Sequence, residues 1–334
     1  MLTVSNPQIF LVPFFAGGKS VILFFVLSGY VLALPYWRNS QLPYGKYLVR
    51  RFCRIYLPYL GALAFAVLVG YRLLNAQLPL THWFYKTWHT PFTPRLIFRQ
   101  ALLAPGRREG AAINPAFWSL TVEMEMSILF PVLCYIVRSL PLLGSVAFAL
   151  GLEIIGIGRY PVISAKIPSE IGTALLWGSA FVFGALLSKE RSRFMGWYER
   201  LNRPCRYLFL FVVVMGYFRG NGTTELSNIP AACGVIVLAE CCRARFWLAF
   251  PVASYLGKIS YSLYLIHATV LFATLILLYG KVPTSLVIGI YLAAAFGLSH
   301  LFCIWIEIPT MNLGRTLTKK RIKEIVITEE SIPV

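Results

Sequence analysis

The sequence predicts an all-α membrane protein, a polytopic bundle of about nine transmembrane helices. Three observations favour it: 58% of the 334 residues are hydrophobic, only 13% are charged, and the apolar stretches are long. A soluble domain carries about a quarter charged residues, whereas a membrane-spanning helix needs roughly 20 apolar residues. Little of the chain remains for a water-soluble domain.

The expected spans follow one another with short hydrophilic connections, and the sixth and seventh are the shortest. They are residues 9–34, 53–71, 116–138, 141–158, 169–187, 206–220, 228–241, 259–279 and 284–306. Residues 91–103, in the longest connection, are expected to form a short helix on the membrane surface or over a cavity. Glu307 precedes Pro309, and since the residue before a proline avoids the helical region, the last helix is expected to stop there.

Basic residues set the expected orientation. The net charge is +18, and in a membrane protein such an excess indicates cytosolic loops rather than nucleic-acid binding. Loops 35–54, 138–140, 188–206, 242–258 and 307–334 carry 20 Lys and Arg, and the opposite set carries 10. We therefore expect a multi-pass protein of the cell membrane, surrounded by membrane lipids, with a cytosolic C-terminus. Nine spans then leave the N-terminus outside, and one further helix before residue 1 would return it to the cytosol.

Several common kinds of site are excluded by their missing motifs. There is no Walker A, GxGxxG, HExxH or paired CxxC motif. Seven cysteines, none of them in residues 73–114, fall in or beside the spans, which indicates buried apolar side chains rather than disulfides. His82 and His89 lie among Trp and Tyr in residues 81–89, a pattern more typical of an aromatic belt than of a metal site. We expect no metal and no tightly bound cofactor.

Ionisable residues inside spans are costly, so each is a candidate for function until a structural partner is found. Glu123 in the third span shares a helical face with Ser119, four residues before it. It is a candidate catalytic residue, and the alternative is a carboxylate that joins two helices through an Arg or a hydroxyl.

The eighth expected span begins with a polar stripe. Ser260, Tyr264 and His267 stand at positions i, i+4 and i+7 of one helical face. A His accepts a proton near neutral pH, which suits removal of a proton from a hydroxyl nucleophile. His267 is thus a candidate catalytic base, and helix–helix hydrogen bonding is the equal alternative. Ser260 and Tyr264 are expected to orient it.

Two further polar groups lie near the expected cytosolic side. His300 and Glu307, seven residues apart on one face of the last span, are expected to have structural or orienting roles. Arg50, Arg51 and Arg54 enter the second span, and Arg binds phosphate through a planar fork of donors. They could hold the phosphates of a nucleotide-containing donor, or serve as topogenic charge beside anionic lipids.

Together these segments resemble the acyltransferase-3 family of multi-pass membrane acyltransferases. The resemblance covers nearly the whole chain, in matching order and spacing. It is carried by VILFFVLSGYVL (21–32), RRFCRIYLPY (50–59), NPAFWSLTVEMEMSILFP (114–131), LGKISYSLYLIH (256–267) and IEIP (306–309).

The resemblance implies transfer of an acyl group, commonly acetyl, from cytosolic acyl-CoA to a hydroxyl of a saccharide or another cell-envelope molecule. Family members have about ten membrane helices. By residue matching, Arg50, Arg51 and Arg54 fall on the basic motif and would approach the CoA phosphates, and Glu123 falls on the Glu of the WSLxxE motif. Ser260, Tyr261 and His267 fall on the SYSLYLxH motif. Residues 1–313 would form the acyltransferase domain, and residues 314–334 a cytosolic polar tail.

One departure from the family pattern concerns its first helix, which normally carries an Arg and, about ten residues later, an essential His. The chain begins at what looks like the second helix, so an inactive, truncated family member stays open as an alternative. The other alternative is a transporter or flippase of lipid-linked glycans, although no inverted repeat or broken helix pair supports it.

Overall fold

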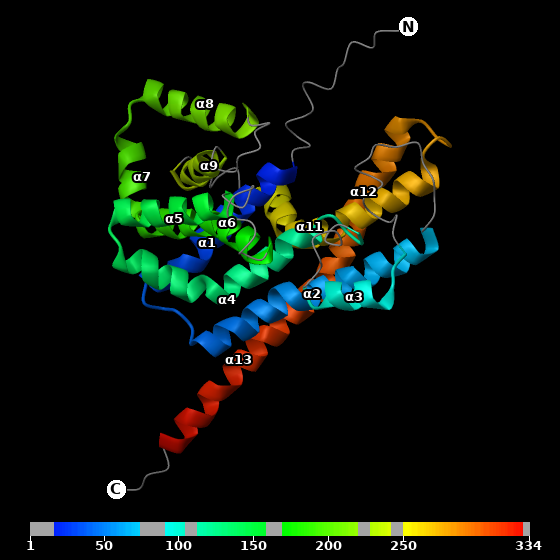
Figure 1. Cartoon of the computed structure of the whole chain (residues 1–334), viewed down its shortest axis with the longest axis horizontal. Coiled ribbons are helices and arrows are strands. Elements are labelled where there is room, and N and C mark those ends of the chain that lie inside the picture. Colours follow the sequence, from blue (N-terminus) through cyan, green and yellow to red (C-terminus); the bar gives the residue numbers. More distant parts are fainter. Residues whose placement is uncertain are drawn as a thin grey trace. The chain divides into compact units, whose positions relative to one another are not determined.

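The computed structural model describes residues 17–73, 91–103, 112–157, 169–219, 228–241 and 250–329. Within these ranges every regular element is a helix (Figure 1). The start of the first expected span, the aromatic segment 81–89 and Cys242 lie outside the described residues.

All nine expected spans coincide with helices. They are α1 (Gly17–Trp37), α2 (Tyr44–Leu73), α4 (Phe117–Ser139), α5 (Leu142–Ile157), α6 (Ser169–Lys189), α8 (Arg203–Arg219), α9 (Ile229–Cys241), α11 (Pro251–Leu278) and α12 (Thr284–Phe302). Five helical stretches of the described chain are long and apolar enough to cross a membrane. The fold is therefore that of an all-α, multi-pass membrane protein, as the composition predicts.

The chain forms two compact units, each built from segments far apart in the sequence. Unit 1 comprises Met1–Gln41 and Leu129–Phe250, and unit 2 comprises Leu42–Ile128 and Pro251–Val334. All nine candidate site residues named from the sequence belong to unit 2.

In unit 1, glycines let α1 and α6 approach each other at backbone distance. A Cβ atom added at Gly29 would lie 2.2 Å from the carbonyl oxygen of Phe181, and one at Gly184 would lie 2.0 Å from that of Val26. Small residues at such positions are the usual means by which membrane helices pack closely. The Gly of the FFVLSGY segment is therefore part of a helix–helix contact.

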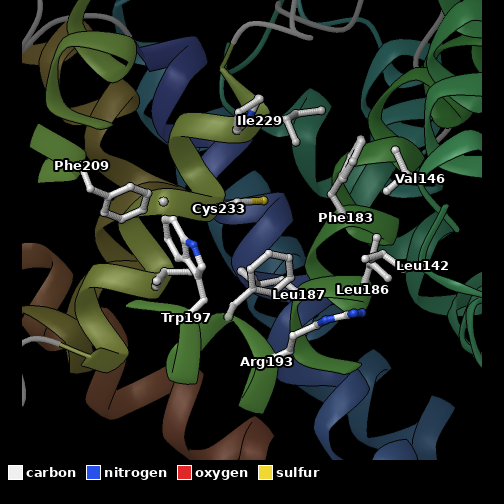
Figure 2. Close-up of a pocket in the computed structure, with 14 residues that line it drawn as sticks. Leu142, Val146, Phe183, Leu186, Leu187, Arg193, Trp197, Phe209, Ile229 and Cys233 are labelled. Carbon is white, nitrogen blue, oxygen red and sulfur yellow. The ribbon is translucent and has the colours of Figure 1, made fainter. Parts of the chain in front are cut away.

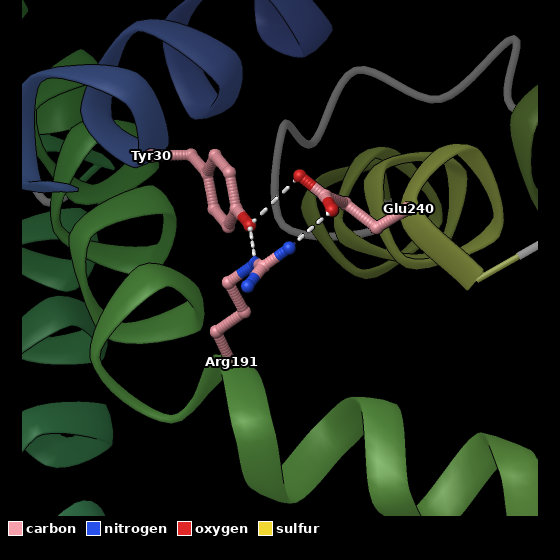
Figure 3. A network of polar contacts seen from close by, with 3 residues as sticks. All are labelled: Tyr30, Arg191 and Glu240. Atoms are coloured by element: carbon pink, nitrogen blue, oxygen red, sulfur yellow. Dashed lines mark hydrogen bonds and ion pairs between the residues drawn. The ribbon is translucent and has the colours of Figure 1, made fainter. Parts of the chain in front are cut away.

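A polar network joins three helices of unit 1 (Figure 3). Arg191 begins α7 (Arg191–Arg200), and its Nη2 atom donates to Oε2 of Glu240 at 2.7 Å. Its Nε atom donates to the hydroxyl of Tyr30 at 2.9 Å, and that hydroxyl donates to Oε1 of Glu240 at 3.2 Å. The hydrogen bond to Glu240 raises the pKa of Arg191, so the guanidinium stays charged. The network fixes the start of α7 between α1 and α9.

In unit 2, α13 (Ile308–Glu329) packs along α2 (Figure 1). Gly314 permits this contact, because a Cβ there would lie 2.9 Å from the Cβ of Cys53. The Nε atom of Arg50 donates to the hydroxyl of Thr318 at 2.9 Å, which also joins the two helices.

The expectation that the last helix stops at Glu307 is wrong. A π-helical turn, η5 (Cys303–Glu307), follows α12, and the N–H of Ile308 donates to the carbonyl of Cys303. Pro309 follows directly after this turn, inside a helical run that is not interrupted. The chain stays helical through Glu329.

Residues 91–103 contain the expected short helix, α3 (Pro94–Ala101), capped at its start by the hydroxyl of Thr93. This helix lies along α2 rather than apart from it. The hydroxyls of Tyr56 and Tyr59 donate to the carbonyls of Ala101 and Gln100, at 2.7 and 2.6 Å. Carbonyls at the end of a helix need such partners wherever water is scarce.

Candidate functional site

Asn114, just before α4, connects the NPAFWSL segment to α11. Its amide nitrogen donates to the carbonyl of Leu265 at 3.1 Å and to the hydroxyl of Thr269 at 3.2 Å. Its amide oxygen accepts from the N–H of Ala116 at 2.8 Å. The side chain is almost fully buried, so it fixes the start of α4 against the middle of α11.

One helical turn further, two hydroxyls meet between the same helices. Ser119 and Tyr264 lie 2.5 Å apart, and both are within hydrogen-bond distance of the carbonyl of Ala116. Each hydroxyl has one hydrogen, so one donates to the carbonyl and the other to its partner hydroxyl. The two helices thus run antiparallel, with residue 119 level with residue 264.

Glu123, one more turn along α4, forms an ion pair with Arg51 of α2. Oε1 of Glu123 lies 3.9 Å from Nη2 of Arg51, and the side chains are 6% and 11% exposed. The other carboxylate oxygen and Nε of Arg51 have no hydrogen-bond partner among the described residues. Glu123 therefore joins two helices through an Arg, and the pair keeps two polar atoms for a further partner.

Tyr261 and Arg54 surround this pair. The hydroxyl of Tyr261 donates to the carbonyl of Ile55 at 3.0 Å, which holds α11 against α2. Arg54, whose side chain is exposed, interacts electrostatically with both Glu123 and Glu307. The three arginines consequently differ: Arg51 is buried and paired, Arg50 is half-buried and bonded to Thr318, and Arg54 is open to solvent.

His267 is half-buried in α11, and its environment fixes one tautomer. Nδ1 lies 3.1 Å from the carbonyl of Leu263 and 2.9 Å from that of Tyr264. A carbonyl only accepts, so Nδ1 carries a hydrogen. In the neutral imidazole the lone pair is then on Nε2, the nitrogen that does not contact its own backbone.

Of the three residues in the expected polar stripe on α11, only Tyr264 and His267 contact each other. The rings of Tyr264 and His267 lie side by side with centroids 5.9 Å apart. Ser260, by contrast, is exposed and donates to the carbonyl of Gly257 in its own helix. Its hydroxyl therefore bonds within its own helix and not to Tyr264 or His267.

His300 and Glu307 have separate partners. The hydroxyl of Tyr255 lies 3.1 Å from Nδ1 of His300, whereas the buried hydroxyl of Ser262 donates to Oε2 of Glu307. The π-helical turn between them adds residues to the turn, so a spacing of seven no longer returns to the same face. Both contacts fasten the last helix to α11.

Asn114 and Ser262 are polar contacts that the helical spacing argument did not identify. Asn114 stood outside the expected span, where its partners could not be inferred, and Ser262 lies off the stripe that begins at Ser260. The only earlier signal was that both fall within the quoted segments NPAFWSL and SYSLYLIH.

The fold and the site define a helical membrane protein in which carboxylate, imidazole and hydroxyl side chains gather between α2, α4 and α11. The chain belongs to the acyltransferase-3 family: the family model described as an acyltransferase domain matches residues 2–304. It is therefore a membrane acyltransferase in general terms. No curated protein and no solved structure matches it.

Proposed function

We propose that this protein transfers an acyl group, most simply acetyl, from acyl-CoA to a hydroxyl of a saccharide or related envelope molecule. The observation that carries the proposal is the order of the polar groups in unit 2. The exposed Arg54 and the half-buried Arg50 come first, the Arg51–Glu123 pair follows, and His267 comes last.

The hydrogen bonds between α4 and α11 give the spacing of that order. Ser119 is level with Tyr264, Glu123 lies four residues from Ser119, and His267 lies three residues from Tyr264 in the opposite direction. At 1.5 Å per residue the two candidate catalytic groups are about 10 Å apart along the helices. They are too far apart to share one proton, so they act on different parts of the reaction.

The donor would bind by its charged end. Arg54 is exposed and Arg50 is half-buried beside it, one turn before on α2, so both can reach phosphate oxygens. Arg51, which is buried and paired with Glu123, would contribute its positive charge to the donor site without contacting solvent. This arrangement favours a CoA thioester whose phosphates stay at the basic end while the acyl group extends toward His267.

The chemistry assigned to His267 is general-base catalysis. Nε2 takes the proton of the acceptor hydroxyl, the hydroxyl oxygen forms a bond to the thioester carbonyl carbon, and the carbon–sulfur bond breaks. The proton then passes to the CoA thiolate, so the products are an ester and free CoA. Glu123, with its unpartnered oxygen, is proposed to orient the reacting groups from the donor side.

The proposed orientation places the basic end in the cytosol, where acyl-CoA is available. It rests on the two-to-one distribution of Lys and Arg between alternate loops. The C-terminal residues would then also be cytosolic, and the protein would lie in the cell membrane.

The test is transfer of radiolabelled acetyl from acetyl-CoA into envelope glycans, measured in membranes that contain the chain. We expect base-labile label in the glycan fraction and a loss of about 10²- to 10⁴-fold in His267→Ala, the usual contribution of a general base. Thr274→Val is the matched control, because Thr274 is buried in the same helix and its hydroxyl donates to the carbonyl of Val270 in that helix. Full activity of His267→Ala, or movement of unmodified glycan without acetyl transfer, would overturn the proposal.

A further inference from the structure

We propose that unit 1 holds one anionic phospholipid, with an acyl chain inside a cavity between α5, α6, α7, α8 and α9 and its headgroup at Arg193. The proposal concerns a part of the chain that takes no part in the acyl transfer described above.

The cavity has a volume of about 560 Å³, and its walls are apolar (Figure 2). Side chains from several helices point into it, among them Val146, Phe183, Trp197, Phe209, Ile229 and Cys233. Ligand pockets in proteins measure about 300–1,000 Å³, so this one is large enough for part of a lipid. A water molecule inside it would find few of the two to four polar partners that it needs.

The cavity is built into a fixed framework. Leu187, Phe194 and Val237 line it on one side and pack on their other side near the Arg191–Glu240 pair. The ion pair and its hydrogen bond to Tyr30 hold the wall helices α7 and α9 together. A cavity that exists before its ligand arrives binds with a smaller ordering cost.

Helix α7 supplies the charge that selects the headgroup. Residues 188–206, which contain α7, carry six Lys and Arg against two Glu. Lys189 and Arg206 are occupied with backbone carbonyls, at 2.7 Å to Leu140 and 2.5 Å to Glu199. Arg193, which lines the cavity, is 69% exposed, and its ion pair among the described residues is a long one of 3.6 Å with Glu190.

Arg193 and Trp197 are four residues apart and share the face of α7 that meets the cavity. A Trp one turn from a basic residue is the arrangement found at the membrane interface, where the ring lies beside the headgroups. An acyl chain in the cavity would contact the ring of Trp197, and the anionic phosphate of the same lipid would pair with the guanidinium of Arg193. These observations favour an anionic phospholipid over a neutral one.

The experiment uses the full chain in nanodiscs that contain a trace of phosphatidylglycerol with a photoactivatable diazirine in one acyl chain. Cross-linked residues are mapped by peptide mass spectrometry, and labelling at lipid-facing Leu208, which is 61% exposed, gives the background. We expect labelling of the cavity wall, Cys233 and Trp197 included, above that background. The same probe with a phosphatidylcholine headgroup should label the wall about fivefold less, the effect of one basic residue near an anionic group.

Substitutions that fill the cavity or remove the charge of Arg193, each with a control, test where the lipid binds. Cys233→Phe fills the cavity and should reduce wall labelling to background, whereas Leu208→Phe should not. Val146→Phe fills the same cavity from α5 and serves if Cys233→Phe does not accumulate. Arg193→Gln should abolish the preference for phosphatidylglycerol, and Arg203→Gln, an exposed residue outside the cavity, should preserve it.

The proposal is overturned if the filled variants are labelled like the original chain, or if both headgroups label the wall equally. Displacement of the probe by a polyprenyl phosphate but not by unlabelled phosphatidylglycerol would also overturn it, because the occupant would then be an isoprenoid carrier. Acetyl transfer is measured on the same samples, so that failure of the lipid site and failure of the enzymatic proposal are separate results.

Discussion

Replacing one member of the Arg51–Glu123 pair should destabilise unit 2, and replacing both should restore much of the loss. The variants are Arg51→Gln, Glu123→Gln and the double variant. The paired atoms are 3.9 Å apart and both side chains are buried, so either single change leaves a charge without its partner.

The size of the effect follows from this geometry. Two unit charges 3.9 Å apart interact with about 4 kcal/mol at an effective dielectric constant near 20. Leaving one buried charge unpaired costs about 3–5 kcal/mol, whereas removing both charges costs far less. Each single variant should thus lower the Tm in detergent by about 6–10 °C, at roughly 2 °C per kcal/mol. The double variant should lie within about 4 °C of the original chain.

Stability alone does not show whether Glu123 takes part in the reaction, so acetyl transfer per folded molecule is measured on the same three variants. We expect the double variant to regain stability but not activity, because the Gln at position 123 cannot supply the carboxylate. The matched control is the pair Arg193–Glu190, with nitrogen and oxygen 3.6 Å apart and an Arg side chain that is 69% exposed. The same Gln substitutions there should change stability by less than about 1 kcal/mol.

Two results would refute this reasoning. If the double variant recovers turnover together with stability, Glu123 acts only by holding α2 and α4 together. If the single variants each cost less than about 1 kcal/mol and their effects add, the pair contributes no coupling energy.

Three further predictions concern single residues. Arg54→Lys should raise the KM for acetyl-CoA about tenfold with little change in kcat, since Lys cannot form the planar fork that holds phosphate; an unchanged KM would remove Arg54 from the donor site. Ser262→Ala leaves the buried carboxylate of Glu307 without its hydroxyl donor and should cost about 1–3 kcal/mol by thermal unfolding, while turnover per folded molecule stays the same. Cys205, exposed at the start of α8, should react with a membrane-impermeant maleimide only after the cells are permeabilised, because the proposed orientation places it in the cytosol. Cys134, which is buried, should react neither before nor after permeabilisation. Labelling of Cys205 in sealed cells would reverse the proposed orientation.

All nine expected spans are helical, and five of them are long and apolar enough to cross a membrane. Apolar runs predict helices well because bilayer thickness sets their length whatever the tertiary contacts are. The added helix α7 and the continuation into α13 were not anticipated. Pro309 predicts a helix stop, but in the structure it follows a π-helical turn and the helix continues. The local sequence does not predict the π-helical turn.

The candidate site was predictable only along single helices. The spacing predicts that Ser119 and Glu123 share one helical face. It does not show that Ser119 contacts Tyr264 or that Glu123 pairs with Arg51. Such partners lie on other helices, and their choice depends on how those helices are rotated against each other. The same limit explains why Ser260 rather than Ser262 was selected, since both fit an amphipathic stripe until the neighbouring helix is known.

The FFVLSGY segment has a different role from the other family segments, because it lies in unit 1 and its contacts there are those of a scaffold. Gly29 faces the backbone of Phe181, and Tyr30 belongs to the network around Arg191. A methyl group at Gly29 would stand 2.2 Å from a carbonyl oxygen that no rotamer change can move. Gly29→Ala should therefore cost about 3 kcal/mol, the upper end of overpacking effects, and lower the amount of folded protein in fluorescence-detected size exclusion.

Gly18→Ala is the matched control on the same helix, since a Cβ there meets nothing within 4 Å. It should leave stability unchanged or raise it by about 0.5–1 kcal/mol, the gain of Ala over Gly within a helix. The fraction of Gly29→Ala that does fold should transfer acetyl at the original rate per molecule, because the acid and base stand in unit 2. Normal accumulation of Gly29→Ala would contradict the close approach of α1 and α6, and a folded but inactive protein would mean that this segment reaches the reacting groups after all.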